Sequence, residues 1–236
     1  MKKTISVSNQ GATLDTNRRN FLKLSGVGLA MAGLTLIGCD DNDFEFVDNN
    51  VFDLGKGDVG VLNYAYALEQ LEADFYTKVV NNFYTGISNA EKQIFTDLYH
   101  HEVIHRDFFK AAITGATANV LPTLEFQYPN VNFNDRNSVL ATAKALEDTG
   151  VAAYNGAGKY ITNVDYLVIA GKIVSVEARH AAAIRDLINP GTAAFSGDDV
   201  INPTTGLDVA KEPKDIVAAA GGFFKTPFTW KEQGIG

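Results

Sequence analysis

The chain has 236 residues, of which 46% are hydrophobic, and a formal net charge of −8. This length suits one domain with additional segments at its ends. Residues 1–38 contain five basic residues and one acid, a net +4, so the rest of the chain carries −12. An acidic main part argues against nucleic acid as a partner.

The first 38 residues have the pattern of an export signal rather than of a folded element. A basic stretch ending in NRRNFLK precedes an apolar run over 24–38. This run is short for a membrane span, and the basic-then-apolar order is that of a signal peptide. Arg18 and Arg19, followed by Phe21, Leu22 and Lys23, resemble the twin-arginine export signal of bacteria. The alternative is an ordinary secretory signal that happens to contain two arginines.

Cys39, the only cysteine, ends the apolar run. Together with Leu36, Ile37 and Gly38 it resembles a bacterial lipobox, in which the cysteine is lipidated and becomes the new N-terminus. A lone cysteine cannot form an internal disulfide, and lipid attachment explains its presence; an incidental cysteine at a cleavage site is the alternative. We therefore expect a signal peptide over 1–38 and an acidic tether over 39–58. The protein is then exported to the cell envelope and anchored to a membrane, on a leaflet that the sequence leaves open.

The first long amphipathic segment, over 59–84, predicts a helix. Its apolar residues recur at spacings of three and four, and Glu69 and Glu72 interrupt the apolar face. Tyr76 follows Glu69 by seven residues, close to two helical turns, and so lies on the same face. We expect Glu69 to belong to a site, with Glu72 either beside it or at the boundary of a wide apolar face.

A second helix is predicted over 88–114, where Ser88 and Glu91 form a capping box. Its inward face carries Glu102 and His105, which lie three residues and therefore one turn apart. His101 lies about 40° around the helix from His105. It is an additional ligand, a hydrogen-bonding neighbour of the ligands, or a surface histidine.

Residues 115–134 show no helical period and contain Pro122 and Pro129. A loop of this length ordinarily counts against a compact helical fold. A bundle with one long crossover between its second and third helices requires such a loop.

Two further helices are predicted over 135–160 and 164–188. The first carries Glu147, with Tyr154 seven residues later, and the second carries Glu177 and His180. We also expect Leu167, near the start of the last helix, to face the interior.

The two halves of the chain therefore repeat one pattern: a glutamate, a tyrosine seven residues later, and a Glu-x-x-His motif. Glu69 precedes Glu102 by 33 residues and Glu147 precedes Glu177 by 30, separations that bring each pair to one level of a helical hairpin. Carboxylates and imidazoles together suit iron, manganese or zinc, and four-helix bundles are known to hold metal with this ligand pattern. The predicted metal site comprises Glu69, Glu102, His105, Glu147, Glu177 and His180, with Tyr76, Tyr154, Glu72 and His101 around them.

Four segments, ALEQLEADFY, HHEVIHRDFF, ALEDTGVAAY and VEARHAAAIRDLI, agree in order and spacing with one family. Over roughly 59–190 the chain resembles ferritin-like proteins, in particular bacterial ones similar to plant desiccation-related proteins. The resemblance implies an all-α fold, a ferritin-like antiparallel four-helix bundle, with a carboxylate-bridged dinuclear metal site. In such a site Glu69 and Glu147 each serve as the single glutamate of their helix, Glu102 and Glu177 bridge or bind, and His105 and His180 each cap one metal.

Residues 191–236 are expected to form an extension that packs on the bundle. Pro213 begins a short helical stretch, and four aromatic residues follow it: Phe223, Phe224, Phe228 and Trp230. These aromatics cover apolar surface of the bundle or, alternatively, form a patch for a partner.

The buried charge favours a metal site. Four carboxylates in a bundle core repel one another and lose hydration, whereas two divalent ions neutralise them. We therefore expect two iron ions, with manganese or zinc as alternatives, in a protein that oxidises iron or reduces O2 or peroxide during stress. A structural stress protein of the desiccation type, metal-stabilised or metal-free and without catalysis, is the alternative. The oligomeric state stays open, a homodimer included.

Overall fold

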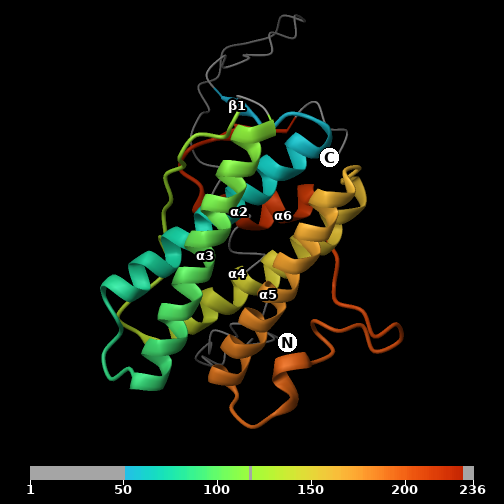
Figure 1. The fold of residues 1–236 in the computed structure, drawn as a ribbon. Coiled ribbons are helices and arrows are strands. Elements are labelled where there is room, and N and C mark those ends of the chain that lie inside the picture. Colours follow the sequence, from blue (N-terminus) through green and yellow to red (C-terminus); the bar gives the residue numbers. More distant parts are fainter. Residues whose placement is uncertain (1–50, 117–118, 231–236) are drawn as a thin grey trace, which may run out of the picture.

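The computed structural model describes residues 51–116 and 119–230, and within them the protein is almost entirely helical. The long helices are α2 (Gly57–Asn81), α3 (Asn89–Ala116), α4 (Arg136–Ala157) and α5 (Val164–Ile188). Smaller elements are β1 (Phe52–Asp53), η1 (Gly158–Tyr160), η2 (Ala193–Ser196), α6 (Pro213–Ala220), η3 (Gly221–Phe223) and β2 (Phe228–Thr229). Helix α2 packs against α3, and α4 against α5, so two hairpins form a four-helix bundle (Figure 1). The all-α prediction is confirmed.

The helix ends follow from local hydrogen bonds. Ser88 Oγ accepts from the backbone N–H of Glu91 at 3.1 Å, and the Glu91 carboxylate accepts from the N–H of Ser88 at 3.0 Å. This is the predicted capping box at the start of α3. Asp135 caps α4 by accepting from the N–H of Ser138, and Asn163 caps α5 by accepting from that of Asp165.

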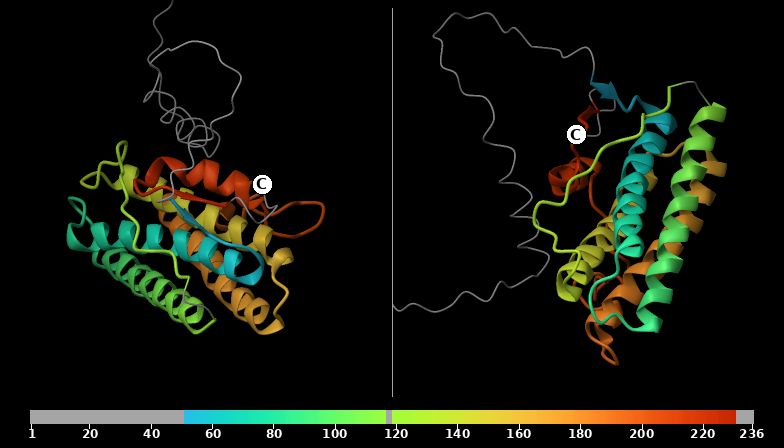
Figure 2. Two further views of the ribbon diagram at one scale, coloured as in Figure 1. Left: turned by 90° about the horizontal axis from the view of Figure 1, so that it is seen from above. Right: turned by 90° about the vertical axis from the view of Figure 1, so that its left-hand side faces the viewer.

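The crossover between α3 and α4 runs along the bundle, as the yellow-green segment in Figure 2 shows. Two buried amide side chains of α2 hold it in place. Asn63 accepts from the N–H of Leu121, and Gln70 accepts from the N–H of Leu124, each at 2.9 Å. These bonds supply partners to a backbone that has no helix or sheet of its own there.

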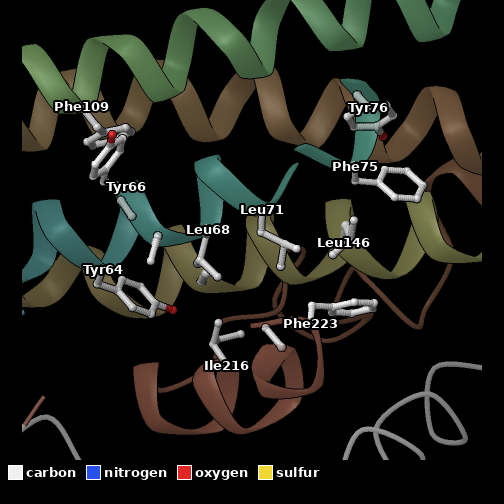
Figure 3. Close-up of a cluster of buried hydrophobic side chains, with 14 of the residues drawn as sticks. Tyr64, Tyr66, Leu68, Leu71, Phe75, Tyr76, Phe109, Leu146, Ile216 and Phe223 are labelled. Carbon is white, nitrogen blue, oxygen red and sulfur yellow. The ribbon is translucent and has the colours of Figure 1, made fainter. Parts of the chain in front are cut away.

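The C-terminal segment packs on the bundle through α6 and the residues around it. Ile216 and Phe223 belong to the buried core, and Figure 3 shows them directed at the layer that contains Leu68, Leu71 and Leu146. Trp230 stacks on Tyr64 with ring centroids 4.9 Å apart. The four aromatic residues singled out in the sequence thus pack against the bundle's core, rather than forming an exposed patch.

Two contacts fix this segment to α4 and α5. A Cβ on Gly156 would lie 1.7 Å from the carbonyl oxygen of Lys211, so only glycine allows the segment to pass there. Arg185 forms a two-bond pair with Asp148, at 2.9 and 2.7 Å, and reaches Asp199 in the C-terminal segment at 2.8 Å. Strand β1 pairs in parallel with β2 and brings the two ends of the described chain together.

One inward-facing prediction was wrong. Leu167 is 44% exposed, whereas Tyr166 and Ile169 pack against the core. The buried face of α5 includes Ile173, so near the start of the helix the inward face lies about one residue away from the predicted one. Within the described residues, every helix is too short or too polar to cross a membrane.

Candidate metal centre

The six predicted ligands meet inside the bundle. Glu69 comes from α2, Glu147 from α4, and the two Glu-x-x-His motifs from α3 and α5. All four carboxylates are fully buried. The side chains of His105 and His180 are 12% and 4% exposed. The helical spacing of the motifs therefore brings two acids and two imidazoles to the level of the two single glutamates.

The cluster consists of two groups that share two members. One group contains Glu69, Glu102, His105 and Glu177, and the other contains Glu102, Glu147, Glu177 and His180. Within each group, one ligand atom per residue lies within 4.8 Å of the others. Glu102 and Glu177 belong to both groups.

The atoms of the shared glutamates divide between the groups. His105 Nδ1 lies 2.9 Å from Glu177 Oε1 and 3.6 Å from Glu102 Oε2. His180 Nδ1 lies 2.8 Å from Glu102 Oε1 and 3.5 Å from Glu177 Oε2. Each shared carboxylate thus turns one oxygen to each group, which is the arrangement of a carboxylate that bridges two ions.

These inward atoms have one another as their nearest polar neighbours, at distances such as 2.8 and 2.9 Å, and make no other hydrogen bond. Among the described residues, ten buried polar side-chain atoms lack one, and two of them are the hydroxyls of Tyr64 and Tyr84. The other eight all belong to the six predicted ligands: both imidazole Nδ1 atoms, both oxygens of Glu102 and Glu177, and Oε2 of Glu69 and Glu147. Because buried polar atoms nearly always have well-formed hydrogen bonds, eight atoms that face only one another around one centre are the pattern expected where cations bind.

The outer oxygens of the single glutamates are held by tyrosines of the opposite hairpin. Tyr76 of α2 donates to Oε1 of Glu147 on α4 at 2.5 Å, and Tyr154 of α4 donates to Oε1 of Glu69 on α2. The sequence indicated that each tyrosine shares a face with the glutamate of its own helix. The hydrogen bonds instead cross between the halves.

Burial and mutual repulsion set the protonation of the cluster. Burial, followed by the charge of Glu177, raises the pKa of Glu102 well above its usual range. Burial also raises the pKa of Glu147, to about 7. Burial disfavours the charged form of His105, but the neighbouring Glu102, Glu177 and Glu69 outweigh it and raise the pKa of His105 to about 12. Burial alone would raise the pKa of Glu177, yet His105 and His180 lower it to about 2.

Glu72 is a fifth buried carboxylate at this centre. It is 3% exposed, and burial together with the charges of Glu102, Glu177, Glu147 and Glu69 raises its pKa well above the usual range. It is therefore not a boundary residue. It lies against Gly150 of α4, where an added Cβ would be 3.1 Å from Oε1 of Glu72.

His101 is exposed at the surface of α3, yet its ring contacts a ligand. Its Nδ1 lies 2.8 Å from Nε2 of His180. Of the three interpretations that the sequence left open, this geometry supports the hydrogen-bonding neighbour. His100 is exposed, and its ring lies 5.0 Å from that of Tyr99.

The donor set fits a pair of first-row divalent ions, since imidazole nitrogen and carboxylate oxygen together suit iron, manganese and zinc. Two such ions would also offset the charge of four buried carboxylates, which is otherwise costly. In comparisons with known proteins, a family described as ferritin-like domain matches residues 57–190. These residues comprise the four long helices and the crossover. A search of curated proteins found no match.

Proposed function

Because the chain belongs to the family of ferritin-like domains, we propose that its buried cluster binds two iron ions and that the protein oxidises iron with O2 or peroxide. The observation that carries this proposal is the set of eight buried ligand atoms that face one another at one centre and have no partner outside it. The division of these atoms into two groups supports two ions rather than one.

The residues present suggest how the ions would be shared. His105 and Glu69 would hold one ion, and His180 and Glu147 would hold the other. Glu102 and Glu177 would bind both, each with one oxygen per ion. Two redox-active ions held by shared carboxylates could together supply the two electrons that one molecule of oxidant takes up.

Bound iron supplies the electrons that reduce O2 or peroxide. The chain's own residues would shield that step from water and orient the ligands. The burial of the cluster would keep bulk water from bound ions. Tyr76 and Tyr154 orient the single glutamates by donating to their outer oxygens. With each outer oxygen held, the inner oxygen of the same carboxylate would stay available to a bound ion.

The location of this activity rests on the sequence. The twin-arginine pattern and Cys39 lie outside the described residues, and they support export and a lipid anchor at the cell envelope. Growth with a labelled fatty acid tests the anchor: wild type takes up label and Cys39→Ser does not. Label in both, or in neither, would rule out lipidation at Cys39.

Metal analysis tests the centre directly. Metal-free protein is loaded anaerobically with Fe(II), freed of excess metal and analysed for iron per chain. We expect two ions in wild type and in the exposed-site control His100→Ala, and fewer in His105→Ala and His180→Ala. Equal iron contents in all four proteins would contradict the proposed ligands. Parallel loading with Mn(II) and Zn(II) identifies the preferred ion.

Oxidation is tested separately from binding. Fe(II)-loaded protein is mixed with O2 or with peroxide, and Fe(III) formation is followed by absorbance. We expect oxidation faster than in buffer alone, and a large loss of this acceleration in Glu102→Gln. Two bound ions with no acceleration would favour the alternative, a metal-stabilised structural protein, in which chelation lowers the melting temperature without abolishing any turnover.

A further inference from the structure

The contact between His101 and His180 has a specific geometry. The ring planes differ by only 7° and the centroids lie 5.1 Å apart, while His101 Nδ1 and His180 Nε2 are 2.8 Å apart. Since the nitrogens are much closer than the centroids, the parallel rings meet edge to edge and not face to face. The hydrogen bond then lies along the line that joins the two rings, which is its most favourable direction.

The two nitrogens of His180 therefore have separate partners. Nδ1 faces the carboxylates of the cluster. A metal ion bound at Nδ1 leaves the ring proton on Nε2, and this N–H donates to Nδ1 of His101. His101 consequently keeps its own proton on Nε2 and presents Nδ1 as the acceptor. This pairing fixes both the tautomer of His180 and the orientation of its ring.

Among the described residues, the His105 half of the cluster has no equivalent pair of imidazoles. His101 directly precedes Glu102, and the residue that directly precedes Glu177 in the second motif is Val176. A valine side chain offers no hydrogen bond. In the part of the chain that the structure describes, His105 has no imidazole partner comparable to the one that His180 has in His101. The pseudo-symmetry of the two motifs is thus broken at this position.

We propose that His101 is a positioning residue for His180, and that it makes the two metal positions unequal, with the tighter ion in the group of Glu102, Glu147, Glu177 and His180. The proposal rests on the proposed function, because it concerns the affinities of the same centre. Partners that orient a ligating histidine contribute about 10–100-fold to metal affinity.

The experiment isolates each half of the centre. In full-length His105→Ala the His180 group keeps its histidine, and in full-length His180→Ala the His105 group keeps its own. Each background is combined with His101→Ala, with His101→Gln and with the neighbouring control His100→Ala. Metal-free proteins are titrated with Co(II), whose visible absorbance reports the dissociation constant, and circular dichroism checks the fold.

We expect His101→Ala to weaken Co(II) binding about 10–100-fold in the His105→Ala background, and to leave it unchanged in the His180→Ala background. His101→Gln restores part of the affinity, since its side-chain carbonyl can accept the same hydrogen bond. His100→Ala has no effect in either background. These results together would separate a role through His180 from a general effect on the helix.

Two outcomes overturn the inference while leaving the proposed function intact. In the first, wild type binds Co(II) in two steps, but His101→Ala does not weaken Co(II) binding in the His105→Ala background. The other is an equal loss in both backgrounds. Absence of Co(II) binding in wild type itself would instead remove the proposed metal centre, and this inference with it.

Discussion

Glu72 and Gly150 occupy equivalent positions in the two halves of the chain and lie against each other. Each follows the single glutamate of its helix by three residues. A Cβ on Gly150 would lie 3.1 Å from Oε1 of Glu72 and 3.8 Å from Oε2 of Glu177. The space for a fifth carboxylate therefore exists because the second half has no side chain at that position.

Gly150→Ala tests this relationship. Replacing a helical glycine with alanine ordinarily stabilises by about 0.5–1 kcal/mol. We expect that gain at Gly171, where a new Cβ meets no atom within 4 Å. At Gly150 the gain should be smaller or reversed because the Glu72 carboxylate must move, and Glu72→Ala should restore it. Urea unfolding of the metal-free proteins measures these changes, and equal gains at both glycines would contradict the contact.

The crossed tyrosine bonds predict a second effect. Tyr76→Phe and Tyr154→Phe each remove a donor from a buried carboxylate, which should lower the free energy of unfolding by about 1–3 kcal/mol. Metal affinity should fall because the glutamates lose their orientation. Tyr64→Phe is the matched control, since its buried hydroxyl has no hydrogen-bond partner in the described structure. Losses of the same size in all three variants would argue against the assigned bonds.

The pH dependence of stability should differ between the metal-free and the metal-bound protein. In the metal-free fold, burial raises the pKa of Glu147 from 4.5 to about 7. Despite burial, the neighbouring carboxylates raise the pKa of His105 from 6.5 to about 12. Both groups bind protons more tightly in the folded state, so their contribution to stability is full below the unfolded pKa. It is lost as pH rises through the folded pKa. The pKa of Glu177 is lowered from 4.5 to about 2, so its contribution to stability is lost only as pH falls below its ordinary pKa of 4.5.

The melting temperature of the metal-free protein should therefore fall as pH rises from about 5 to about 8. Metal must displace protons from the same groups, so the stabilisation by added Mn(II) or Zn(II) should grow over that range. Scanning calorimetry with chelator and with metal measures both. A metal-free protein that becomes more stable toward pH 8 would contradict the protonation of the cluster.

The buried pair of Arg185 and Asp148 predicts a large structural effect away from the metal. Arg185→Ala leaves Asp148 buried and uncompensated, which should cost about 3–5 kcal/mol. It also removes the hydrogen bonds from Arg185 to Asp199 in the C-terminal segment. Lys159→Ala removes an exposed ion pair to Glu212 in the same segment and should change little. Denaturant unfolding compares them, and a small loss at Arg185 would indicate that the pair is not essential to the segment's attachment.

The repeated motif made the centre of the fold predictable. Residues separated by three in one helix must share a face, so the placement of Glu102 beside His105 required no tertiary information. Apolar periodicity located the helices, and the separations of 33 and 30 residues indicated that each single glutamate lies level with its motif in a hairpin. The predicted helices differ from those of the structure mainly at their ends. The first helix, for example, was predicted to end at residue 84, whereas α2 ends at Asn81.

Features that depend on contacts between helices were not predictable in the same way. The tyrosines were assigned to the correct face, but only the packing of α2 against α4 shows that each bonds the opposite glutamate. Leu167 was placed inward because a regular stripe was extended to the start of α5. Gly150 has no side chain, so nothing in its local sequence indicates that a carboxylate fills the space beside it.

The crossed tyrosine bonds bear on how such a chain could have arisen. In a single hairpin with the pattern of α2 and α3, the tyrosine lies about two helical turns from the glutamate and cannot hydrogen-bond to it. In two copies of that hairpin related by a two-fold axis, each tyrosine could donate a hydrogen bond to the glutamate of the other copy. The present protein has the internal geometry expected of two such hairpins joined in one chain, and the halves differ where Glu72 faces Gly150 and where Val176 stands in place of a second His101.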